Sequence, residues 1–510
     1  MKPQLLKSLK TYNKKDILGD LLAGLMVAII ALPLSMALGI QSVPDSVSQN
    51  GIQMGIITAI IAGFFISFLG GSKFQIGGPT AAFVAILAGY LLNPQIGILG
   101  VAIAGIFAGV LLILMGLLKC GKVMKFFPYP ITIGFTTGIG ITLIIGQIKD
   151  LCGFTGSVGA EALEKIAFYF ENLSTFHLPT FIVGLVGFLI VFFLPKINKK
   201  IPAAFVALIC CTLITLLFNG VFHLEVATIQ TRYGKISAEF YPLNFSKIGT
   251  LNLGALIVPT ITIAFLCAIE SLLSATVAGG MTGTTFDSNQ ELIGQGVANI
   301  FSSVLGGLPA TGAIARTAAG IENGAKSPLT GVFHALFLLV MYFLLMDVVK
   351  YIPMAVFASI LVGVAINMSR FPLFIKLTRF GVRDVIVLVL TCLLTVIFDL
   401  TYGVIGGIIV AILANIKNIK TGLKIQINEN IVSVSGGLCF VNVNKLIDCL
   451  AKLQDEKIVL DLEKTTSIDQ TALEKIIKLT KQFSANQRVL EILNANAKTK
   501  ARIDKYFNVI

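Results

Sequence analysis

The chain has 510 residues, of which 55% are hydrophobic and 13% are charged. Soluble proteins carry about a quarter charged residues, so this composition excludes an ordinary soluble protein and indicates a polytopic membrane protein. The formal net charge is +13, but the basic residues lie in short loops between apolar runs, where they orient a membrane protein, and we expect no nucleic-acid partner.

Apolar runs of membrane-spanning length recur after a lysine-containing segment at residues 1–20. The first run is longer than the apolar part of a secretory signal, so we expect it to be a membrane span. The runs lie at residues 21–40, 51–69, 95–118, 128–149, 178–195, 201–219, 252–278, 328–347, 350–366, 383–399 and 401–418. Three weaker stretches, at 76–92, 290–305 and 309–321, are short or rich in glycine and hydroxyl residues. Together they predict fourteen elements in a transport domain at residues 21–418.

Lysine and arginine residues divide unevenly between the predicted loops. With the N-terminus inside, the inside loops hold 17 of them and the outside loops hold 6. Cytoplasmic loops are the basic ones in membrane proteins. We therefore expect both termini in the cytoplasm.

Fourteen elements divide into two halves of seven. Because seven is odd, the second half enters the membrane from the opposite side, which gives a 7+7 inverted repeat. A faint echo in the sequence supports this arrangement, since 47 residues separate Pro33 from Thr80 and 47 separate Glu270 from Thr317.

The composition changes after Lys420. Strands are predicted at 431–435, 457–461 and 488–493, and helices at 444–453, 470–483 and 497–506. These elements indicate a small soluble α/β domain at residues 421–510. The basic loop before it places this domain in the cytoplasm.

Two stretches have the composition of helices that begin inside the membrane. Gly77-Gly78-Pro79 precedes Thr80-Ala81-Ala82, and Gly306-Gly307-Leu308-Pro309 precedes the run from Gly312 to Thr317. Broken backbone at membrane depth is tolerated only where it lines a cavity or is packed in protein. Two facing helix N-termini supply about one positive charge, which suits an anion, and Arg316 adds another if its head reaches the site. The alternative is that the glycines only allow close helix packing.

One carboxylate, Glu270, lies within the apolar run at 252–278, where a charge is costly and marks a functional site. Ser274 follows one turn later on the same face. An ionised Glu270 cancels part of the positive field, whereas a Glu270 that has taken up H⁺ or Na⁺ admits the anion. Glu270 and Ser274 are therefore the candidates for a coupling-ion site. The alternative is a structural ion pair between Glu270 and Arg316.

The first span is also predicted to be broken, because its Pro33 removes a helix hydrogen bond. Broken spans at corresponding places in two halves mark a substrate site. Ser35 is the only polar side chain nearby, which makes it a candidate for substrate binding.

Signals for an enzyme are absent. Residues 320–327 resemble a phosphate loop, but Ala325 separates the glycine from the lysine, and we expect a cytoplasmic turn there. The eight cysteines and three histidines have no metal-ligand spacing. We expect no cofactor, and no metal other than the Na⁺ considered for Glu270 and Ser274.

Four motifs together resemble the SulP (sulfate permease) family of anion transporters along almost the whole chain. They are Gly77-Gly78-Pro79-Thr80-Ala81, Glu270-Ser-Leu-Leu-Ser274-Ala, Asp287-Ser-Asn-Gln-Glu291-Leu, and Gly306-Gly-Leu-Pro309 through Ala315-Arg316-Thr317. Residues 459–462 and 468–473 make the C-terminal domain similar to STAS domains. The resemblance implies inverted spans in a core and a gate domain, a homodimer, and an elevator-like movement of the core.

The resemblance also implies that the anion lies between the third and tenth elements, beside the eighth. The matching wall residues are Thr80 and Ala81 in the third element and Gly312, Ala313, Ile314 and Ala315 in the tenth. Glu270 and Ser274 match the family's acid and hydroxyl, which are implicated in proton or sodium coupling. Leu34 and the pair Ile314–Ala315 depart from the family pattern, which often has glutamine and hydroxyl residues there. The anion is therefore expected to be held more by backbone dipoles than by side chains.

In the STAS domain, Gln470 replaces a serine that often follows the aspartate. Thr471 keeps the position that is phosphorylated in related soluble antagonists, which makes it the candidate regulatory residue. Asp469 is expected to cap the start of the helix. A cytoplasmic protein partner would bind through this domain.

Three functions are compatible with these features. The leading hypothesis is a secondary transporter of sulfate, bicarbonate, chloride or dicarboxylate, coupled to H⁺ or Na⁺ through Glu270. The second is an uncoupled anion channel or exchanger on the same scaffold. The third is a membrane-anchored regulatory module in which the STAS domain carries the activity.

Overall fold

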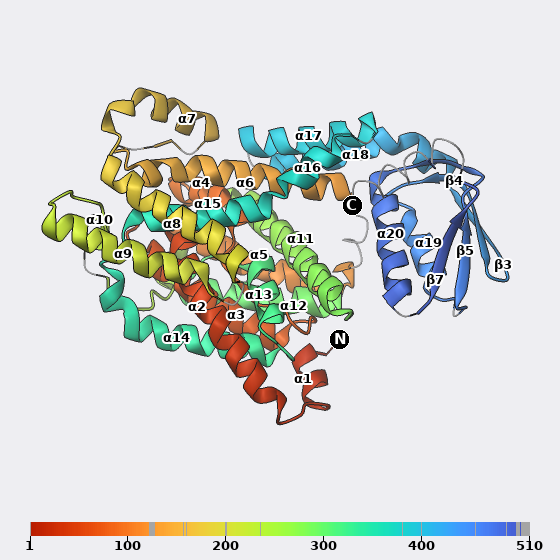
Figure 1. Ribbon diagram of the computed structural model, residues 1–510, viewed down its shortest axis with the longest axis horizontal. Coiled ribbons are helices and arrows are strands. Elements are labelled where there is room, and N and C mark those ends of the chain that lie inside the picture. The colour runs from red at the N-terminus through yellow and green to blue at the C-terminus, as the bar shows by residue number, and fades with distance from the viewer. Residues whose placement is uncertain are drawn as a thin grey trace. The chain divides into compact units, whose positions relative to one another are not determined.

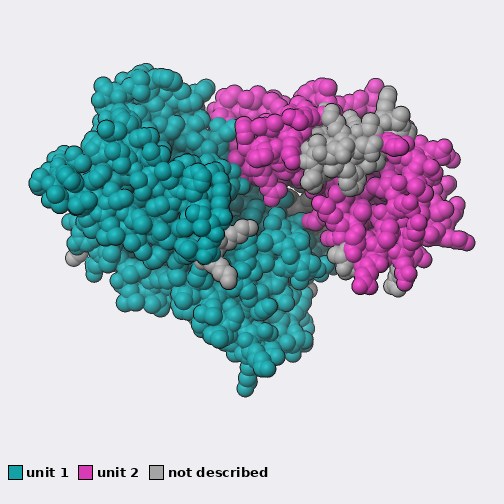
Figure 2. Space-filling model, in the orientation of Figure 1, with its two compact units in different colours: residues 1–122, 140–367 teal, residues 123–139, 368–510 magenta. Residues whose placement is uncertain are grey.

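A computed structural model of the chain forms two compact units (Figure 2). One unit comprises residues 1–122 and 140–367, and the other comprises residues 123–139 and 368–510. The structure describes residues 2–121, 128–156, 158–159, 161–198, 201–234, 236–379, 381–398, 400–453, 455–485, 487–495 and 500.

A helix lies at each of the fourteen predicted membrane elements (Figure 1). Ten of them are α2 (Asp16–Ser42), α3 (Gly51–Leu69), α5 (Gly97–Leu117), α6 (Tyr129–Cys152), α8 (Leu178–Ile197), α9 (Ala203–Val221), α11 (Ile257–Thr282), α14 (Leu329–Val349), α15 (Met354–Ser369) and α18 (Leu400–Thr421). The other four are α4 (Ala81–Leu92), α12 (Ser288–Val304), α13 (Ile314–Glu322) and α17 (Val382–Ile397). Within the described ranges, ten helices are long and apolar enough to cross a membrane. The remaining long run, predicted at 383–399, forms α17, which has only 16 residues.

The connecting segments contain short helices that were not predicted. They are α1 (Gln4–Leu9), α7 (Ala162–Glu171), α10 (Ile229–Tyr233) and α16 (Phe371–Leu377). α10 is held at the start of α15, because the Ile229 and Gln230 N–H groups donate to the Ile352 and Lys350 carbonyls at 2.9 Å.

The prediction that Pro33 breaks the first span is wrong. α2 is one continuous helix from Asp16 to Ser42 with Pro33 inside it. Proline in a membrane helix is tolerated where neighbouring helices and hydroxyl side chains satisfy the backbone, and α2 packs against α3, α13 and α14. Close to the proline, the Ser35 hydroxyl donates to the Ala31 carbonyl at 2.6 Å.

α2 and α3 approach each other so closely that their backbones are in contact. A Cβ on Gly39 would lie 2.1 Å from the Gly51 carbonyl oxygen, and a Cβ on Gly55 would lie 2.2 Å from the Ser35 carbonyl oxygen. Only glycine fits at such distances, and small residues let membrane helices pack in this way. These contacts fix α2, and with it Ser35, against α3.

The helices of the first unit form two packing groups. The core group, α2 to α5 together with α11 to α14, consists of helices that pack against one another. The peripheral group contains α8, α9, α15 and the end of α6. α8 packs against α9, the Ser359 hydroxyl of α15 donates to the Gly184 carbonyl of α8 at 2.6 Å, and Leu151 of α6 packs on Gly184.

A cluster of polar and charged side chains, the Arg232 cluster, joins the two groups. Arg232 of α10 donates to Asp45 through Nε and to Asp150 through Nη1, both at 2.7 Å. Tyr233 donates to Asp45 at 2.7 Å, and Gln41 donates to Asp150 at 3.3 Å. Gln41 lies in the last turn of α2 and Asp45 directly after that helix, both in the core group, whereas Asp150 is in α6. The members of the cluster lie in or next to loops that are predicted to be outside, because these loops contain few lysine and arginine residues.

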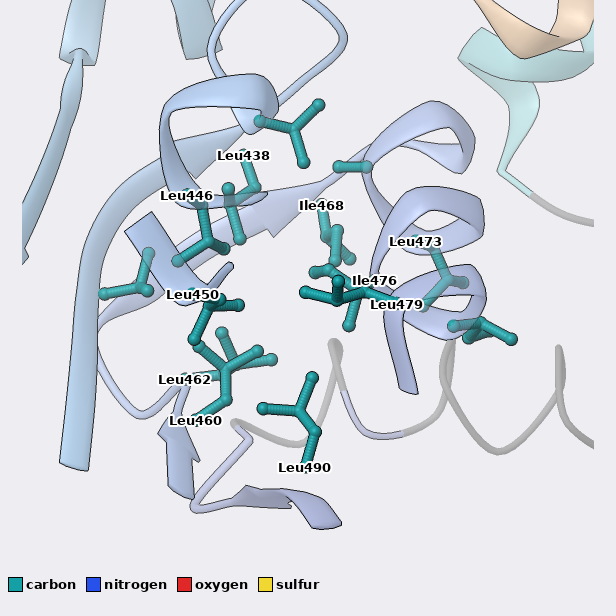
Figure 3. Packing of buried hydrophobic residues seen from close by; sticks show 14 of the residues in the cluster. Leu438, Leu446, Leu450, Leu460, Leu462, Ile468, Leu473, Ile476, Leu479 and Leu490 are labelled. Atoms are coloured by element: carbon teal, nitrogen blue, oxygen red, sulfur yellow. The ribbon is translucent and has the colours of Figure 1, made fainter. Parts of the chain in front are cut away.

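The second unit contains a sheet with two helices. Its strands are β3 (Leu423–Asn428), β4 (Ile431–Leu438), β5 (Lys457–Asp461), β6 (Thr465–Ile468) and β7 (Val489–Leu493). β4 pairs antiparallel with β3 and parallel with β5 and β6, and β5 pairs parallel with β7. Figure 3 shows the apolar core, to which α19 (Val443–Leu450) contributes Leu446 and Leu450, α20 (Gln470–Ala485) contributes Leu473 and Ile476, and β5 contributes Leu460.

The strands predicted at 431–435, 457–461 and 488–493 and the helices predicted at 444–453 and 470–483 are present. β3 and β6 were not predicted. β3 alternates apolar and polar residues from Leu423 to Asn428, so its signal was available in the sequence, whereas β6 has only four residues, mostly hydroxyl-bearing. Of the helix predicted at 497–506, only Lys500 is among the described residues.

Asp469 caps α20, as predicted. Its Oδ1 accepts the Ala472 N–H and its Oδ2 accepts the Phe440 N–H, both at 2.7 Å. Burial raises the pKa of the Asp469 carboxyl to about 7, so this cap changes its charge near neutral pH.

Thr471 is buried at the start of the same helix. Its side chain is 2% exposed, and its hydroxyl oxygen accepts the Tyr129 N–H at 2.9 Å. Phosphorylation of Thr471 stays a prediction, and a kinase would reach this hydroxyl only after the contact with Tyr129 opens.

Candidate functional site

Two broken segments of the chain meet in a short antiparallel ladder. In this ladder β1 (Gly77–Gly78) pairs with β2 (Thr311–Gly312), so that Gly77 is opposite Gly312 and Gly78 is opposite Thr311. α4 begins at Ala81, shortly after β1, and α13 begins at Ile314, shortly after β2. The two predicted half-helices therefore begin on either side of one ladder.

Within the described part of the chain, no side chain caps the N-terminus of either half-helix. Thr80 and Ala313 occupy the positions just before the helices in extended backbone, and neither makes a side-chain capping hydrogen bond. Uncapped N–H groups and the helix dipole make such an N-terminus a binding site for an anion. Around them Ala81, Gly312 and Ala313 are buried, Ile314 is partly exposed and Ala315 is exposed.

Glu270 reaches the first half-helix from α11. Its Oε2 accepts the Thr80 hydroxyl hydrogen at 2.9 Å. Ile269 and Ser271 on either side are fully buried, but Glu270 itself keeps part of its surface exposed. The carboxylate therefore lies beside the N-terminus of α4.

Arg316 reaches from α13 to the other side of the ladder. Its Nη1 donates to the Gly77 carbonyl at 3.2 Å, and its Nη2 donates to the Ser35 hydroxyl at 3.1 Å. The side chain is fully buried, and its Nε is without a hydrogen-bond partner among the described residues. A Cβ on Gly78 would lie 1.6 Å from Nη1, and the φ angle of +154° at Gly78 also requires glycine. Arg316 therefore packs directly against β1, next to the N-terminus of α4.

The alternative ion pair between Glu270 and Arg316 is not formed. In the part of the chain that the structure describes, no carboxylate lies within 4 Å of the Arg316 guanidinium. A buried charge without an opposite partner is costly by several kcal/mol, roughly, unless an ion or dipoles compensate it. The carbonyl of Gly77 and the hydroxyl of Ser35 supply dipoles only. The arginine therefore adds a positive charge to the site that no described side chain neutralises.

Ser274 has a different partner from the one its spacing suggested. It is fully buried, and its hydroxyl donates to the Thr317 hydroxyl at 3.5 Å, while the Thr317 oxygen accepts the Ile76 N–H at 3.1 Å. Ser274 thus supports the backbone that enters β1. Its role in holding a coupling ion stays a prediction.

Two site residues, Ser271 and Gln75, were missed from the sequence. The Ser271 hydroxyl lies 2.6 Å from the Thr311 hydroxyl oxygen and accepts the Gly312 N–H at 3.1 Å. Gln75 donates to the Ser271 carbonyl at 3.0 Å. The sequence signal for Ser271 was a second hydroxyl residue beside Glu270 in an apolar run. Its role in the site cannot be seen from the sequence, because it depends on the packing of β2 against α11.

The electrostatic balance of the site favours an anion. Each half-helix N-terminus carries about half a positive charge, so with Arg316 the total is about two positive charges against the one carboxylate of Glu270. Among the described residues, no three His, Cys, Asp or Glu side chains are grouped so that they could hold a metal ion.

Fold and site together define a class of protein: a polytopic helical membrane protein whose two broken elements meet at a positively charged site, followed by a small α/β domain. The chain belongs to the sulfate permease family, whose model matches residues 17–391. Residues 423–507 match the STAS domain. It is therefore a multi-pass membrane anion transporter and not an enzyme.

Relatives and solved structures resemble the chain over most of its length. YvdB of Bacillus subtilis (strain 168) is 34% identical over 513 residues, which cover 97% of this chain and 95% of YvdB. The bicarbonate transporter BicA of Picosynechococcus sp. is 30% identical over 431 residues, covering 82% and 73%. The transmembrane domain of a cyanobacterial BicA matches with a TM-score of 0.69 at 28% identity, covering 77% of this chain and 98% of that one. SLC26A9 matches with a TM-score of 0.71 at 18% identity, covering 99% and 88%, and shares the fold.

Proposed function

We propose that the chain is a secondary active transporter of small oxyanions, of the sulfate, bicarbonate or dicarboxylate class, driven by H⁺ or Na⁺ in a bacterial plasma membrane. The observation that carries the proposal is Arg316, a fully buried cation that no carboxylate of the described residues neutralises, placed where two half-helices begin without a side-chain cap. Backbone N–H groups and a guanidinium are the groups that bind oxyanions in proteins.

Glu270 gives this site its coupling. When ionised, it removes about half of the positive charge of the site. When it takes up H⁺ or Na⁺, the full charge is available to an anion. Because the Thr80 hydroxyl donates to this carboxylate and Thr80 directly precedes α4, the change of charge acts on the N–H groups that bind the anion. Anion and cation therefore bind together.

Uptake into proteoliposomes tests the function. We expect labelled sulfate, dicarboxylate or bicarbonate to accumulate against its gradient when an inward H⁺ or Na⁺ gradient is imposed, and to equilibrate without one. Bicarbonate is tested with Na⁺ alone, since a pH gradient moves inorganic carbon by itself. Anion currents without accumulation under either gradient would instead identify a channel or an uncoupled exchanger.

The implied elevator-like movement requires the core and peripheral groups to move relative to each other. The Arg232 cluster joins these groups, so it must open during transport. We expect a disulfide between cysteines introduced at Asp45 and Arg232 to reduce uptake in proportion to the cross-linked fraction, and reduction to restore it.

Each single cysteine variant, oxidised in the same way, is the control for the native cysteines. Full uptake by completely cross-linked protein would show that these groups need not separate. The homodimer and a protein partner for the STAS domain are further proposals, which rest on the family resemblance. The cytoplasmic termini are a proposal that rests on the distribution of basic residues between the loops.

A further inference from the structure

α12 is rich in polar residues for a membrane element, and three of its buried polar residues follow a regular spacing. Glu291, Gln295 and Asn299 lie four residues apart, so they share one face of the helix. All three are fully buried. Gln295 donates to Glu291 Oε1 at 2.9 Å, and the Asn299 side chain donates to the Gln295 carbonyl at 2.8 Å. We call these three residues the α12 ladder.

The first end of the ladder holds the segment that leads into β1. Glu291 Oε2 accepts the Gly71 N–H at 2.8 Å and the Ser72 N–H at 3.0 Å. The Asp287 N–H donates to the Gly71 carbonyl at 3.1 Å, and Gln290 donates to the Leu69 carbonyl at 2.7 Å. The first turn of α12 is thus bonded to residues 69–72, shortly before Gly77 and Gly78.

The other end holds the segment that leads into β2. The Asn299 side chain donates to the Ala310 carbonyl and accepts the Ala310 N–H, both at 2.9 Å. Ala310 directly precedes Thr311, the first residue of β2. One helix is therefore hydrogen-bonded to both broken segments. The two bonding residues, Glu291 and Asn299, are about 12 Å apart along the helix axis.

We propose that the α12 ladder positions the two half-helix N-termini for anion binding, with Glu291 and Asn299 as positioning residues. The proposal rests on the proposed function. Anion affinity depends on N–H groups from both segments pointing at one place, and small misplacements in such sites are costly. Glu291 acts through the bonds its oxygens accept and not through its charge, since it already has backbone and amide donors on both oxygens.

Four variants of the full-length protein separate positioning from other roles. Asn299→Leu and Glu291→Leu remove the ends of the ladder. Glu291→Gln keeps a side-chain oxygen for the Gly71 and Ser72 N–H groups, and Gln295 can turn its amide to accept from the new one. Ser303→Ala is the matched control, because Ser303 is a buried polar residue of α12 whose hydroxyl bonds to no other described residue.

The readouts are KM and Vmax for anion uptake, and backbone hydrogen exchange of the anion-free protein. We expect Asn299→Leu and Glu291→Leu to raise KM roughly tenfold or more, with Vmax per folded transporter little changed. Exchange should accelerate at residues 310–312 in Asn299→Leu and at residues 71–72 in Glu291→Leu. Glu291→Gln and Ser303→Ala should resemble the wild type in both measurements.

Three results would overturn the proposal. Faster backbone hydrogen exchange with an unchanged KM would give the ladder a purely structural role. A Glu291→Gln variant with a KM as high as that of Glu291→Leu would show that Glu291 acts through its charge. Unchanged backbone hydrogen exchange at residues 310–312 in Asn299→Leu would show that Asn299 does not hold the segment that leads into β2. A wild-type protein that fails to transport any test anion would count against the proposed function. Backbone hydrogen exchange is measured without anion, so it would still show whether the α12 ladder holds the two segments.

Discussion

Arg316→Met is expected to weaken anion binding about 100-fold, because it removes the buried positive charge beside both half-helix N-termini. A charge-assisted hydrogen bond contributes about 1.5–3 kcal/mol, and each 1.4 kcal/mol corresponds to about tenfold in affinity. Arg316→Lys keeps the charge but cannot reach Gly77 and Ser35 together as the planar fork does. It should therefore bind with intermediate affinity. Equilibrium binding of labelled sulfate or dicarboxylate to purified protein measures both effects.

Removal of a guanidinium from the second unit provides the control. Arg488 donates to the Leu453 and Asp455 carbonyls there, so Arg488→Met lowers the net charge equally without touching the site. It should leave the anion Kd unchanged. An Arg316→Met protein that is folded and still binds the anion with wild-type affinity would refute the role of Arg316.

Glu270→Gln is expected to abolish accumulation driven by an H⁺ or Na⁺ gradient, so that the ratio of internal to external anion falls to one. Glutamine has the size of glutamate and can still accept the Thr80 hydroxyl hydrogen, but it takes up neither cation. The variant therefore resembles a site that is permanently loaded with its cation. Exchange of internal for external anion should persist, because the N–H groups and Arg316 are intact.

Glu291→Gln is the matched control for this substitution, since it neutralises a second carboxylate of the same helix group, and this one is fully buried. It should retain gradient-driven accumulation. If Glu270→Gln accumulates anion as the wild type does, the coupling role of Glu270 is wrong, and the channel or exchanger function becomes the better account.

Much of the membrane fold was predictable, because spans are long, apolar and separated by basic loops. The half-helices were predictable from glycine and proline at two places. α12 gave a weak signal because its inward face carries the ladder residues Glu291, Gln295 and Asn299. The break at Pro33 was predicted wrongly, since whether a proline breaks a membrane helix depends on the neighbours that satisfy its backbone. That information lies in the packing of α2 and not in its own sequence.

The site was predictable in its residue types and less so in its contacts. Glu270 and Arg316 stood out as charges in apolar surroundings. Their partners, Thr80 for one and Gly77 with Ser35 for the other, depend on the pairing of β1 with β2. That pairing joins two-residue strands far apart in sequence, and no local pattern indicates it. For the same reason Ser274 was grouped with Glu270, although its hydroxyl bonds to Thr317.

The position of a bound anion tests the central claim most directly. Crystals grown with selenate, or with bromide as a monovalent probe, would give an anomalous difference map that locates the heavy atom. The account predicts a peak between the first turns of α4 and α13, next to Thr80 and Ala315. A strong peak elsewhere in the transport domain, with none at these two N-termini, would contradict it.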